Sequence, residues 1–330
     1  MSAEWLYEAG IGEERAIYVA NGAILSARLD WGETVKPGLV APARLVMRHA
    51  GSRRGVVRLE DGTEALIDQL PREATEGVPL TVRIVRSAIA ERGRTKLPVA
   101  RNAPGDEPRP APTLREELEA SGARVRPMPS GSGEFSRHGW DELVGQAMSG
   151  EIAFAGGALL VSATPAMTLF DIDGSLPPLK LSLAATGAIA DALHQLDIAG
   201  NIGIDFPTLS EKKDRQHVDT ALGDALLDWQ GEKTSMNGFG FVQLVARLER
   251  PSLVSRFARD PAGAMARQLL RRAEAVREPG ALCLEAHQRV LDAITPAWEA
   301  ELARRTGRTI RRRADIAMGL HAAHVQAVPL

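Results

Sequence analysis

The sequence of 330 residues contains a single cysteine, Cys283. One thiol excludes a disulfide bond within the chain and any zinc site that needs several cysteines, and it is typical of a reducing compartment. The seven histidines do not cluster at a spacing that suits a metal ion. No apolar run approaches the roughly 18 residues of a membrane helix, and the first residues lack a charged and then apolar leader. We therefore expect a cytoplasmic protein without a membrane partner.

Aromatic residues make up only 4% of the chain. They are missing from the strand-like runs of residues 35–100, although proteins that bind single-stranded nucleic acid normally carry stacking rings on such strands. A Ser-His-Asp pattern, a glycine-rich phosphate loop and a dinucleotide fingerprint are also absent from the sequence. The sequence thus carries no sign of a serine hydrolase, a P-loop enzyme or a dinucleotide-dependent enzyme.

Basic and acidic residues are nearly balanced, with 40 Lys and Arg against 42 Asp and Glu. Most of the basic residues are arginines, whose planar guanidinium group suits phosphate recognition. A GC-rich genome also enriches arginine, so the bias alone has more than one explanation. The length allows about two or three domains, and a hydrophobic share of 44% is ordinary for globular proteins.

Short strands with turn signals dominate the first hundred residues. Strand-like runs in residues 5–30 meet at Asn21-Gly22, which is the strongest short signal for a hairpin. Residues 35–100 contain further runs at a spacing of about ten residues, with another turn at Asp61-Gly62, which predicts a small β-barrel. Arginines recur along these runs, so the barrel presents either a face for a nucleic-acid backbone or a solvated basic face.

The composition changes sharply after residue 100. Residues 101–138 are rich in proline, glycine and serine, which predicts a linker, with one short helix that begins at a capping box of Thr113 and Glu116. Residues 254–330 are predicted to be helical and rich in arginine, with six arginines among residues 304–313. Such a density favours contact with phosphate, and a solvated helix end is the alternative.

Residues 158–206 carry the strongest functional signal. Two apolar strand-like segments each end near acidic residues, Asp171 and Asp173 on the first and Asp205 on the second, and a helical run separates them. Helices that bridge parallel strands make an α/β layer, in which neighbouring strands lie about 5 Å apart. Carboxylates without histidine or cysteine favour hard ions such as magnesium or manganese. We interpret this segment as a divalent-metal site, and an acidic strand-to-turn transition is the alternative.

Three segments in order resemble the ribonuclease E/G family of bacterial endoribonucleases. GGALLVSATPAMTLFDIDGS is similar to a strand pair of the family that ends in Ile-Asp-Val-Asn. LAATGAIADALHQLDIAGNIGIDFPTL is similar to its helix followed by a Gly-Ile-Ile-Val-Ile-Asp-Phe strand, and EKTSMNGFGFVQLVARLERPSL to its segment that ends in Leu-Val-Glu-Met-Thr-Arg. The tail LARRTGRTIRRRAD is similar to its closing basic segment. The resemblance implies hydrolysis of single-stranded RNA by a metal-activated water, which leaves a 5′-phosphate and a 3′-hydroxyl.

The resemblance also assigns roles to individual residues. Asp171 and Asp205 fall on the two magnesium-holding aspartates of the family, and Asp173 falls where the family has an auxiliary asparagine. These three residues are therefore expected to be catalytic and metal-binding, with Mg²⁺ or Mn²⁺ as the cofactor. The expected RNA-binding residues are Arg92, Arg94, Lys96, Arg247, Arg250 and Arg311.

Other positions depart from the family. Its paired cysteines, which share zinc between protomers, are absent, so we expect no zinc and any homo-oligomer would form without a zinc link. Its sensor of a 5′-monophosphate falls in the proline-rich residues 101–138, so we do not expect 5′-end sensing. Aliphatic residues near Val57 and Leu66 stand in place of its stacking phenylalanines, which predicts a weaker hold on single-stranded RNA.

The expected fold is an α/β protein with an RNase H-like nuclease core, an inserted N-terminal OB-type β-barrel and a helical, basic C-terminal region. Residues 1–34 would be N-terminal strands of the nuclease unit, 35–100 the RNA-binding barrel, 101–138 a linker or reduced sensor region, 139–253 the catalytic core, and 254–330 the C-terminal region. The leading functional hypothesis is a metal-dependent endoribonuclease that acts in RNA processing. A catalytically weak RNA-binding or regulatory relative is the alternative, and a structural or small-molecule-binding α/β protein is a third hypothesis.

Overall fold

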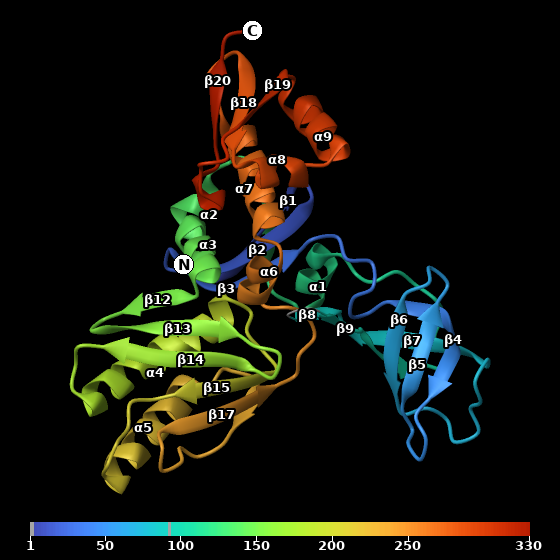
Figure 1. Ribbon diagram of the computed structural model, residues 1–330, viewed down its shortest axis with the longest axis vertical. Helices are drawn as coiled ribbons and strands as arrows, with labels where there is room; N and C mark the ends of the chain where they lie inside the picture. The colour runs from blue at the N-terminus through green and yellow to red at the C-terminus, as the bar shows by residue number, and fades with distance from the viewer. Residues whose placement is uncertain (1–2, 92–93) are drawn as a thin grey trace.

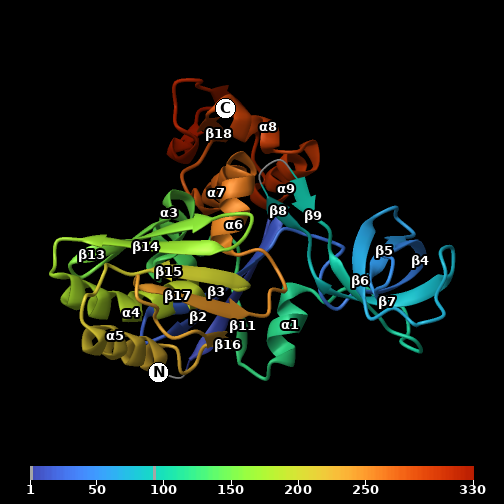
Figure 2. The same ribbon diagram turned by 60° about the horizontal axis from the view of Figure 1, so that its bottom comes forward.

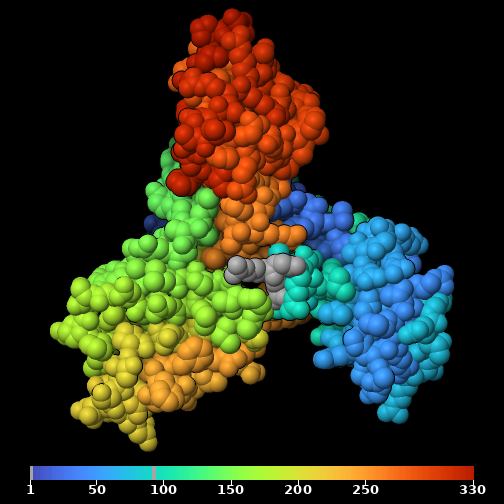
Figure 3. Space-filling view, in the orientation of Figure 1, coloured from blue at the N-terminus to red at the C-terminus, as the bar shows by residue number. Residues whose placement is uncertain are grey.

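The computed structural model describes residues 3–91 and 94–330. Three lobes are visible in Figures 1 and 3: a barrel, a sheet covered by helices, and a C-terminal unit. The N-terminal strands and the helix α7 (Pro261–Ala275) lie where the lobes meet (Figure 1). The predicted RNA contact Arg92 lies outside the described residues. No helix of the described ranges combines the length and the apolar character needed to cross a lipid bilayer.

The N-terminal sheet has the strand order β11-β1-β2-β3. Its strands are β1 (Glu4–Gly10), β2 (Glu13–Ala20), β3 (Ala23–Asp30) and β11 (Val125–Pro127), and β11 runs parallel to β1. Asn21 and Gly22 both have positive φ, 51° and 85°, which a type I′ turn requires. The hairpin predicted at Asn21-Gly22 is therefore confirmed.

Residues 101–138 are not an extended linker. The helix α1 (Leu114–Ala120) begins at Thr113, and the capping box of Thr113 and Glu116 is present as predicted. The buried Leu114 and Leu118 of α1 pack with Trp5 on the N-terminal sheet. Because β11 also pairs with β1, this segment is an integral part of the N-terminal layer.

A closed five-stranded barrel follows the N-terminal hairpin, which confirms the predicted small barrel. Its strands are β4 (Val40–Arg48), β5 (Gly55–Leu59), β6 (Glu64–Asp68), β7 (Pro79–Arg86) and β10 (Val99–Asn102), in the order β10-β6-β5-β4-β7. All neighbours are antiparallel except β6 and β10, which are parallel. Between β7 and β10, the short strands β8 (Ile89–Glu91) and β9 (Arg94–Lys96) form a separate hairpin that lies between the barrel and α6 (Figure 2).

The largest sheet has six strands in the order β12-β13-β14-β15-β17-β16. They are β12 (Glu151–Phe154), β13 (Gly157–Ala163), β14 (Thr168–Gly174), β15 (Asn201–Asp205), β17 (Phe241–Ala246) and β16 (Gly231–Lys233). Only the β14–β15 pair is parallel, and the helix α4 (Pro178–Gln195) connects these two strands. Figures 1 and 2 show α4 and the helix α5 (Lys212–Ala225) on the same face of the sheet. The protein is therefore a mixed α/β fold with an added barrel.

One hydrophobic core holds the N-terminal sheet and the six-stranded sheet together. Leu6 and Ile17 of the first sheet belong to the same buried cluster as Phe170 and Ile204 of the second, with Ile189 of α4 between them. The helix α3 (Trp140–Ser149) and the short helix α2 (Glu134–Arg137) contribute Trp140 and Phe135 to this cluster. Burial of these side chains fixes α4, and through α4 the register of β14 against β15.

The prediction of a purely helical C-terminal region is wrong. The helices α6 (Leu253–Arg259), α7, α8 (Gln288–Ala293) and α9 (Pro296–Thr306) accompany a three-stranded sheet in the order β19-β18-β20. Its strands are β18 (Ala281–Ala286), β19 (Ile310–Ala314) and β20 (His324–Val328), and the 3-10 helix Leu320–Ala322 precedes β20. Every residue of β18 is buried, and a short run that is buried on both faces shows no alternation in the sequence.

The arginines of residues 304–313 are mostly exposed, and most of them contact other groups of the protein. Arg304 and Arg305 pair with Glu301, and Arg308 donates to the carbonyl oxygens of Gly280, Val276 and Glu278. Arg312 contacts Glu299, and Arg313 pairs with Glu285 at 2.7 Å. Within the described residues, Arg311 alone of this run makes no ion pair or side-chain hydrogen bond. Most of these arginines therefore already have partners within the protein, and the expected contact with phosphate stays a prediction.

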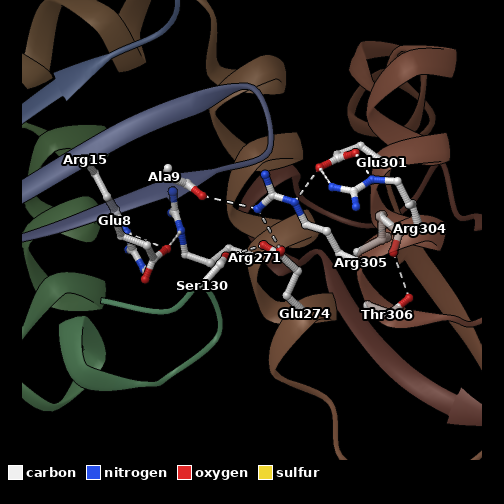
Figure 4. Close-up of polar contacts among 11 residues, drawn as sticks. Glu8, Ala9, Arg15, Ser130, Arg271, Glu274, Glu301, Arg304, Arg305 and Thr306 are labelled. Carbon is white, nitrogen blue, oxygen red and sulfur yellow. Dashed lines mark hydrogen bonds and ion pairs between the residues drawn. The ribbon is translucent and has the colours of Figure 1, made fainter. Parts of the chain in front are cut away.

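A buried ionic network joins this unit to the N-terminal sheet (Figure 4). Arg15 and Arg271 both bind the carboxylate of Glu8, with N–O distances of 3.1 and 2.9 Å, and Arg271 also pairs with Glu13. All four side chains are buried. Burial, and next the like charge of Arg271, lower the pKa of Arg15 to about 9, so its guanidinium stays protonated at neutral pH. Nearby, Arg305 bridges the carbonyl oxygen of Ala9 and Glu274 (Figure 4).

We predict that Arg271→Met lowers the free energy of unfolding by about 3–5 kcal/mol, because it leaves Glu8 and Glu13 buried with too little positive charge. Urea denaturation measures the decrease. Arg289→Met is the matched control, since Arg289 is exposed on α8 and has no ion pair within the described ranges; it should change stability by less than about 0.5 kcal/mol. Equal effects of the two substitutions would show that the network does not stabilise the fold.

Candidate functional site

Asp171 and Asp205 are register partners on the parallel strands β14 and β15. Leu160 on β13 is the partner of Asp171 on one side, and Phe241 on β17 is the partner of Asp205 on the other. A single row across four strands therefore reads Leu160, Asp171, Asp205, Phe241. The structure thus brings together the two aspartates that the sequence singled out.

Alternation along the strands places both carboxylates on the face away from α4 and α5. Phe170 and Ile172 on β14 and Ile204 on β15 are buried under the helices, whereas Asp171 and Asp205 are exposed. In a strand, successive side chains point to opposite faces, so an inward apolar residue on either side directs each aspartate outward. The carboxylates are hydrated, which removes the burial cost that a strand-borne aspartate would otherwise carry.

The two carboxylates repel each other. Within the described residues neither Asp171 nor Asp205 has a hydrogen-bond or ion-pair partner. Like charges directly opposite each other in a sheet are destabilising, and at about 5 Å in water the repulsion is about 1 kcal/mol. A bound cation would remove this repulsion, and the donor set of oxygen atoms without sulfur or nitrogen suits a hard divalent ion.

Asp173 is placed differently from the other two. It is two residues beyond Asp171 on the same face, opposite Ala158, and β15 ends before it reaches this level. Its Oδ1 accepts a hydrogen bond of 2.8 Å from the backbone N–H of Gly174. Across residues 3–91 and 94–330 no group of three or more histidine, cysteine, aspartate or glutamate side chains is arranged to hold a metal. The expected three-carboxylate cluster is therefore not formed, and a pair remains. Magnesium is commonly bound by one or two carboxylates together with waters and substrate phosphates, so the pair still fits this ion.

Gly203 makes room on the exposed face beside the pair. A Cβ at Gly203 would lie 2.6 Å from Cζ of Phe241 and 2.9 Å from Cδ2 of Leu169. The ring of Phe241 therefore lies across the β15 backbone where a larger residue would displace it. An apolar surface borders Asp205 on this side, and Leu160, which is 40% exposed, borders Asp171 on the other.

A cleft of about 820 Å³ opens at the other end of the same two strands. It is lined by residues of the β8–β9 hairpin, the β13–β14 turn, the start of β15 and the helix α6. Its charged lining residues are Arg86, Lys96 and Arg259, and the described lining includes no carboxylate. Thr168 and Asn201 at its edge precede Asp171 and Asp205 by three and four residues, which corresponds to about 10–13 Å along a strand. A basic cleft and the acidic pair therefore lie at opposite ends of the same two strands.

Lys96 is the predicted RNA-binding residue that the structure places in this cleft. Its Nζ donates to the carbonyl oxygen of Pro165 at 2.9 Å, which joins the hairpin to the β13–β14 turn. Arg94 is exposed on the same short strand. Arg86 is one of the arginines that recur along the predicted barrel strands, whereas no local pattern pointed to Arg259. Only the tertiary structure brings β7 and α6 to Lys96.

The other predicted RNA-binding residues have different surroundings. Arg250 is surrounded by the carboxylates of Glu117, Asp197 and Glu249, at 2.6, 3.5 and 3.7 Å, so its charge is used to hold α1 against the core. Arg247 is exposed and pairs with Glu249. Arg311 is exposed on β19, in the C-terminal unit and apart from the six-stranded sheet (Figure 1). We therefore exclude Arg250 and Arg311 from the candidate site.

The two barrel positions with aliphatic residues in place of stacking rings differ from each other. Val57 lies in the closed core of the barrel and is fully buried, whereas Leu66 is 37% exposed. Of these two residues, only Leu66 is accessible to a ligand. Its aliphatic side chain has no aromatic ring on which a base could stack.

No family model matches the sequence of this chain, and no curated protein is significantly similar to it. The functional assignment therefore depends on the residues and their geometry.

We predict that Asp205→Asn stabilises the metal-free protein by about 0.5–1 kcal/mol, because it removes the repulsion between Asp171 and Asp205. The same substitution should abolish the rise in melting temperature that Mg²⁺ or Mn²⁺ produces in the parent protein. Thermal unfolding with and without each ion measures both effects. Glu151→Gln on β12 is the control, since Glu151 lies in the same row beyond Leu160 and should keep the response to metal. Loss of the response in both variants would argue against a site at the pair.

Proposed function

We propose that this protein is a metal-dependent endoribonuclease that hydrolyses phosphodiester bonds in single-stranded RNA, of the type found in the ribonuclease E/G family. The observation that carries the proposal is the register pairing of Asp171 with Asp205 on an exposed sheet face. Two unpaired carboxylates in this arrangement would hold a divalent ion at a point on the exposed face that a phosphate group is also able to approach.

The architecture supports the proposal. The strands β12, β13 and β14 are consecutive and antiparallel, and a crossover through α4 adds β15 parallel to β14, which is the arrangement expected of an RNase H-like core. The barrel closes with the order β4-β5-β6-β10-β7 and a single parallel pair, β6 with β10, which suits an OB-type barrel. Both assignments are consistent with the resemblance of the sequence motifs.

The positive charge of the cleft also supports the proposal. Arg86, Lys96 and Arg259 gather positive charge at the other end of the strands that carry the acidic pair, and the cleft has a volume in the range of ligand-binding clefts. An RNA strand that crosses the sheet face would have some phosphates near these cations and one phosphate near the pair. Arginine and lysine contacts to phosphates supply most of the sequence-independent affinity of such complexes.

The two aspartates would hold the divalent ion in place, and the ion would supply the chemistry of hydrolysis. A bound Mg²⁺ or Mn²⁺ would stabilise the charge that develops on the phosphate and activate a water for in-line attack. Asp171 and Asp205 would hold this ion, and Asp173 would orient a water at the edge of the site. Attack of water on phosphorus with departure of the 3′-oxygen yields a 5′-phosphate on one product and a 3′-hydroxyl on the other.

RNA binding without cleavage is the second candidate function. It is favoured by the position of Asp173 outside a three-carboxylate group and by a barrel whose exposed aliphatic Leu66 cannot stack on a base. A protein that binds RNA in a salt-dependent manner and never cleaves it in titrations with magnesium and manganese would have this function instead.

We predict that Asp205→Asn and Asp171→Asn each reduce the cleavage of an unstructured labelled RNA by at least about a hundredfold, because either change removes a ligand of the ion. Gel analysis of the products in Mg²⁺ measures the rate, and phosphatase sensitivity identifies the 5′-phosphate. The Glu151→Gln variant should cleave at the rate of the parent protein. If Asp205→Asn cleaves as fast as the parent, the site assignment is wrong.

We predict that Arg259→Ala weakens RNA binding and reduces the slope of log K against log salt concentration by about 0.7 for each phosphate that the variant no longer neutralises. The measurement uses fluorescence anisotropy of a labelled oligouridylate in the Asp205→Asn background, where cleavage does not interfere. Arg289→Ala makes the same charge change on α8, far from the cleft, and should leave the slope unchanged. An unchanged slope for Arg259→Ala would exclude the cleft from the RNA path.

A further inference from the structure

Phe239 is the only exposed one of the chain's seven phenylalanines, all of which lie in described residues. Its side chain is 84% exposed. The described tryptophans and tyrosines are buried or half-buried, so Phe239 is also the most accessible ring of the described chain. Burying a phenylalanine is worth about 1.5–3 kcal/mol, so leaving this ring in water forfeits stabilisation that the fold gains elsewhere.

The turn that carries Phe239 is held rigidly. Oδ1 of Asn237 accepts hydrogen bonds from the backbone N–H groups of Phe239 and Phe241, at 2.9 and 3.0 Å. The backbone of Asn237 also donates to the carbonyl oxygen of Phe241 at 3.0 Å, and Gly240 donates to the carbonyl oxygen of Asn237 at 3.2 Å. The ring is therefore presented on a fixed support, which lowers the entropy cost of binding a ligand to it.

The same turn is attached to the strand of Asp205. Phe206, the residue after Asp205, donates its N–H to the carbonyl oxygen of Gly240 at 3.2 Å. Gly240 has a φ of 91°, and a Cβ at this position would lie 2.6 Å from the carbonyl oxygen of Phe206. Glycine thus permits both the left-handed backbone and the close approach. Phe239 is two residues from Phe241, the register partner of Asp205, so its position relative to the pair is fixed by the sheet.

The exposed ring of Phe239 is on a turn that is hydrogen-bonded to the end of β15, and this ring together with the exposed carboxylates of Asp171 and Asp205 matches the two halves of a nucleotide. The carboxylate pair takes the phosphate through a cation, and the ring offers an apolar face for a base. Stacking of a base on an aromatic side chain is worth about 1–3 kcal/mol and tolerates any base. The described residues of the barrel include no phenylalanine, tyrosine or tryptophan that could stack on a base. An unpaired base of RNA is therefore the occupant that the surroundings of Phe239 favour over a purely apolar partner.

We propose that Phe239 is the base-stacking residue of the site, and that it holds the base of a nucleotide adjacent to the phosphate at Asp171 and Asp205. The proposal rests on the proposed function, because it assigns Phe239 to the RNA that the pair would cleave. It makes Phe239 a positioning residue: the ring fixes one base, and the backbone of that nucleotide then presents its phosphate to the pair.

The test is a scan with oligoribonucleotides in which one nucleotide at a time lacks its base. For the parent protein, removal of one particular base should lower kcat/KM by about 5- to 100-fold. Phe239→Ala should lower kcat/KM on the intact oligonucleotide by a similar factor and should show no further decrease on that abasic substrate. Phe239→Trp, which keeps an aromatic ring, should cleave the intact oligonucleotide like the parent and should again lose kcat/KM when that base is removed. A role of Phe239 in structure alone would lower the rate equally on every substrate.

The controls separate this inference from the proposed function. Leu227→Ala removes another apolar side chain of similar exposure, 80%, at the end of α5 and should cleave all substrates like the parent. If the parent cleaves RNA and Phe239→Ala cleaves equally well, this inference fails and the proposed function stands. If the parent neither binds nor cleaves RNA, both fail. If Phe239→Ala sediments differently from the parent and shows no base-specific effect on kcat/KM, the inference is overturned and the ring is identified as a contact between copies of the chain.

Discussion

The parallel pairing of β14 with β15 is the constraint on which the candidate site depends. It sets Asp171 beside Asp205, and a shift of one residue would turn one of the carboxylates toward the helices. The pairing requires a crossover, and α4 provides it while packing Ile189 between the two sheets. The core that buries α4 therefore also determines the distance between the carboxylates.

Arginine has several distinct uses in this chain. Arg15 and Arg271 neutralise buried carboxylates and attach the C-terminal unit to the N-terminal sheet. The arginines near the end of the chain mainly bind carboxylates and carbonyl groups of their own unit. Many others are exposed on the surface, and among these Arg259 lines the basic cleft. The abundance of arginine is therefore poor evidence of RNA binding, whereas its location in a cleft whose described lining includes no carboxylate is stronger evidence.

The candidate site combines three kinds of surface within a short distance. The carboxylate pair is bordered by Leu160 and by the ring of Phe241, and the turn with Phe239 is attached to the end of β15. The basic cleft lies at the start of the same strands. Basic, cation-binding and apolar surfaces in this order along the strands suit a flexible chain of phosphates and bases. The carboxylate pair is on strands and Phe239 is on a hydrogen-bonded turn, so little reorganisation of these two surfaces is needed when a ligand binds.

Local patterns in the sequence predicted a substantial part of the fold. The hairpin at Asn21-Gly22, the capping box at Thr113 and the small barrel were all predicted, because each depends on residues that are close in the chain. The acidic strand ends were identified for the same reason. The strand β18 was missed, since a short run that is buried on both faces has no alternation and looks like part of a buried helix.

The sequence by itself determined which residues were candidates for chemistry: Asp171 and Asp205 at strand ends, and Lys96 among basic residues. Only the tertiary structure decided how they are combined. It paired the two aspartates, left Asp173 beyond the end of β15, and enclosed Arg250 among carboxylates. It also placed Arg86 and Arg259 beside Lys96. The reason is that register, burial and charge pairing depend on which distant segments pack together, and a local pattern contains no information about its partners.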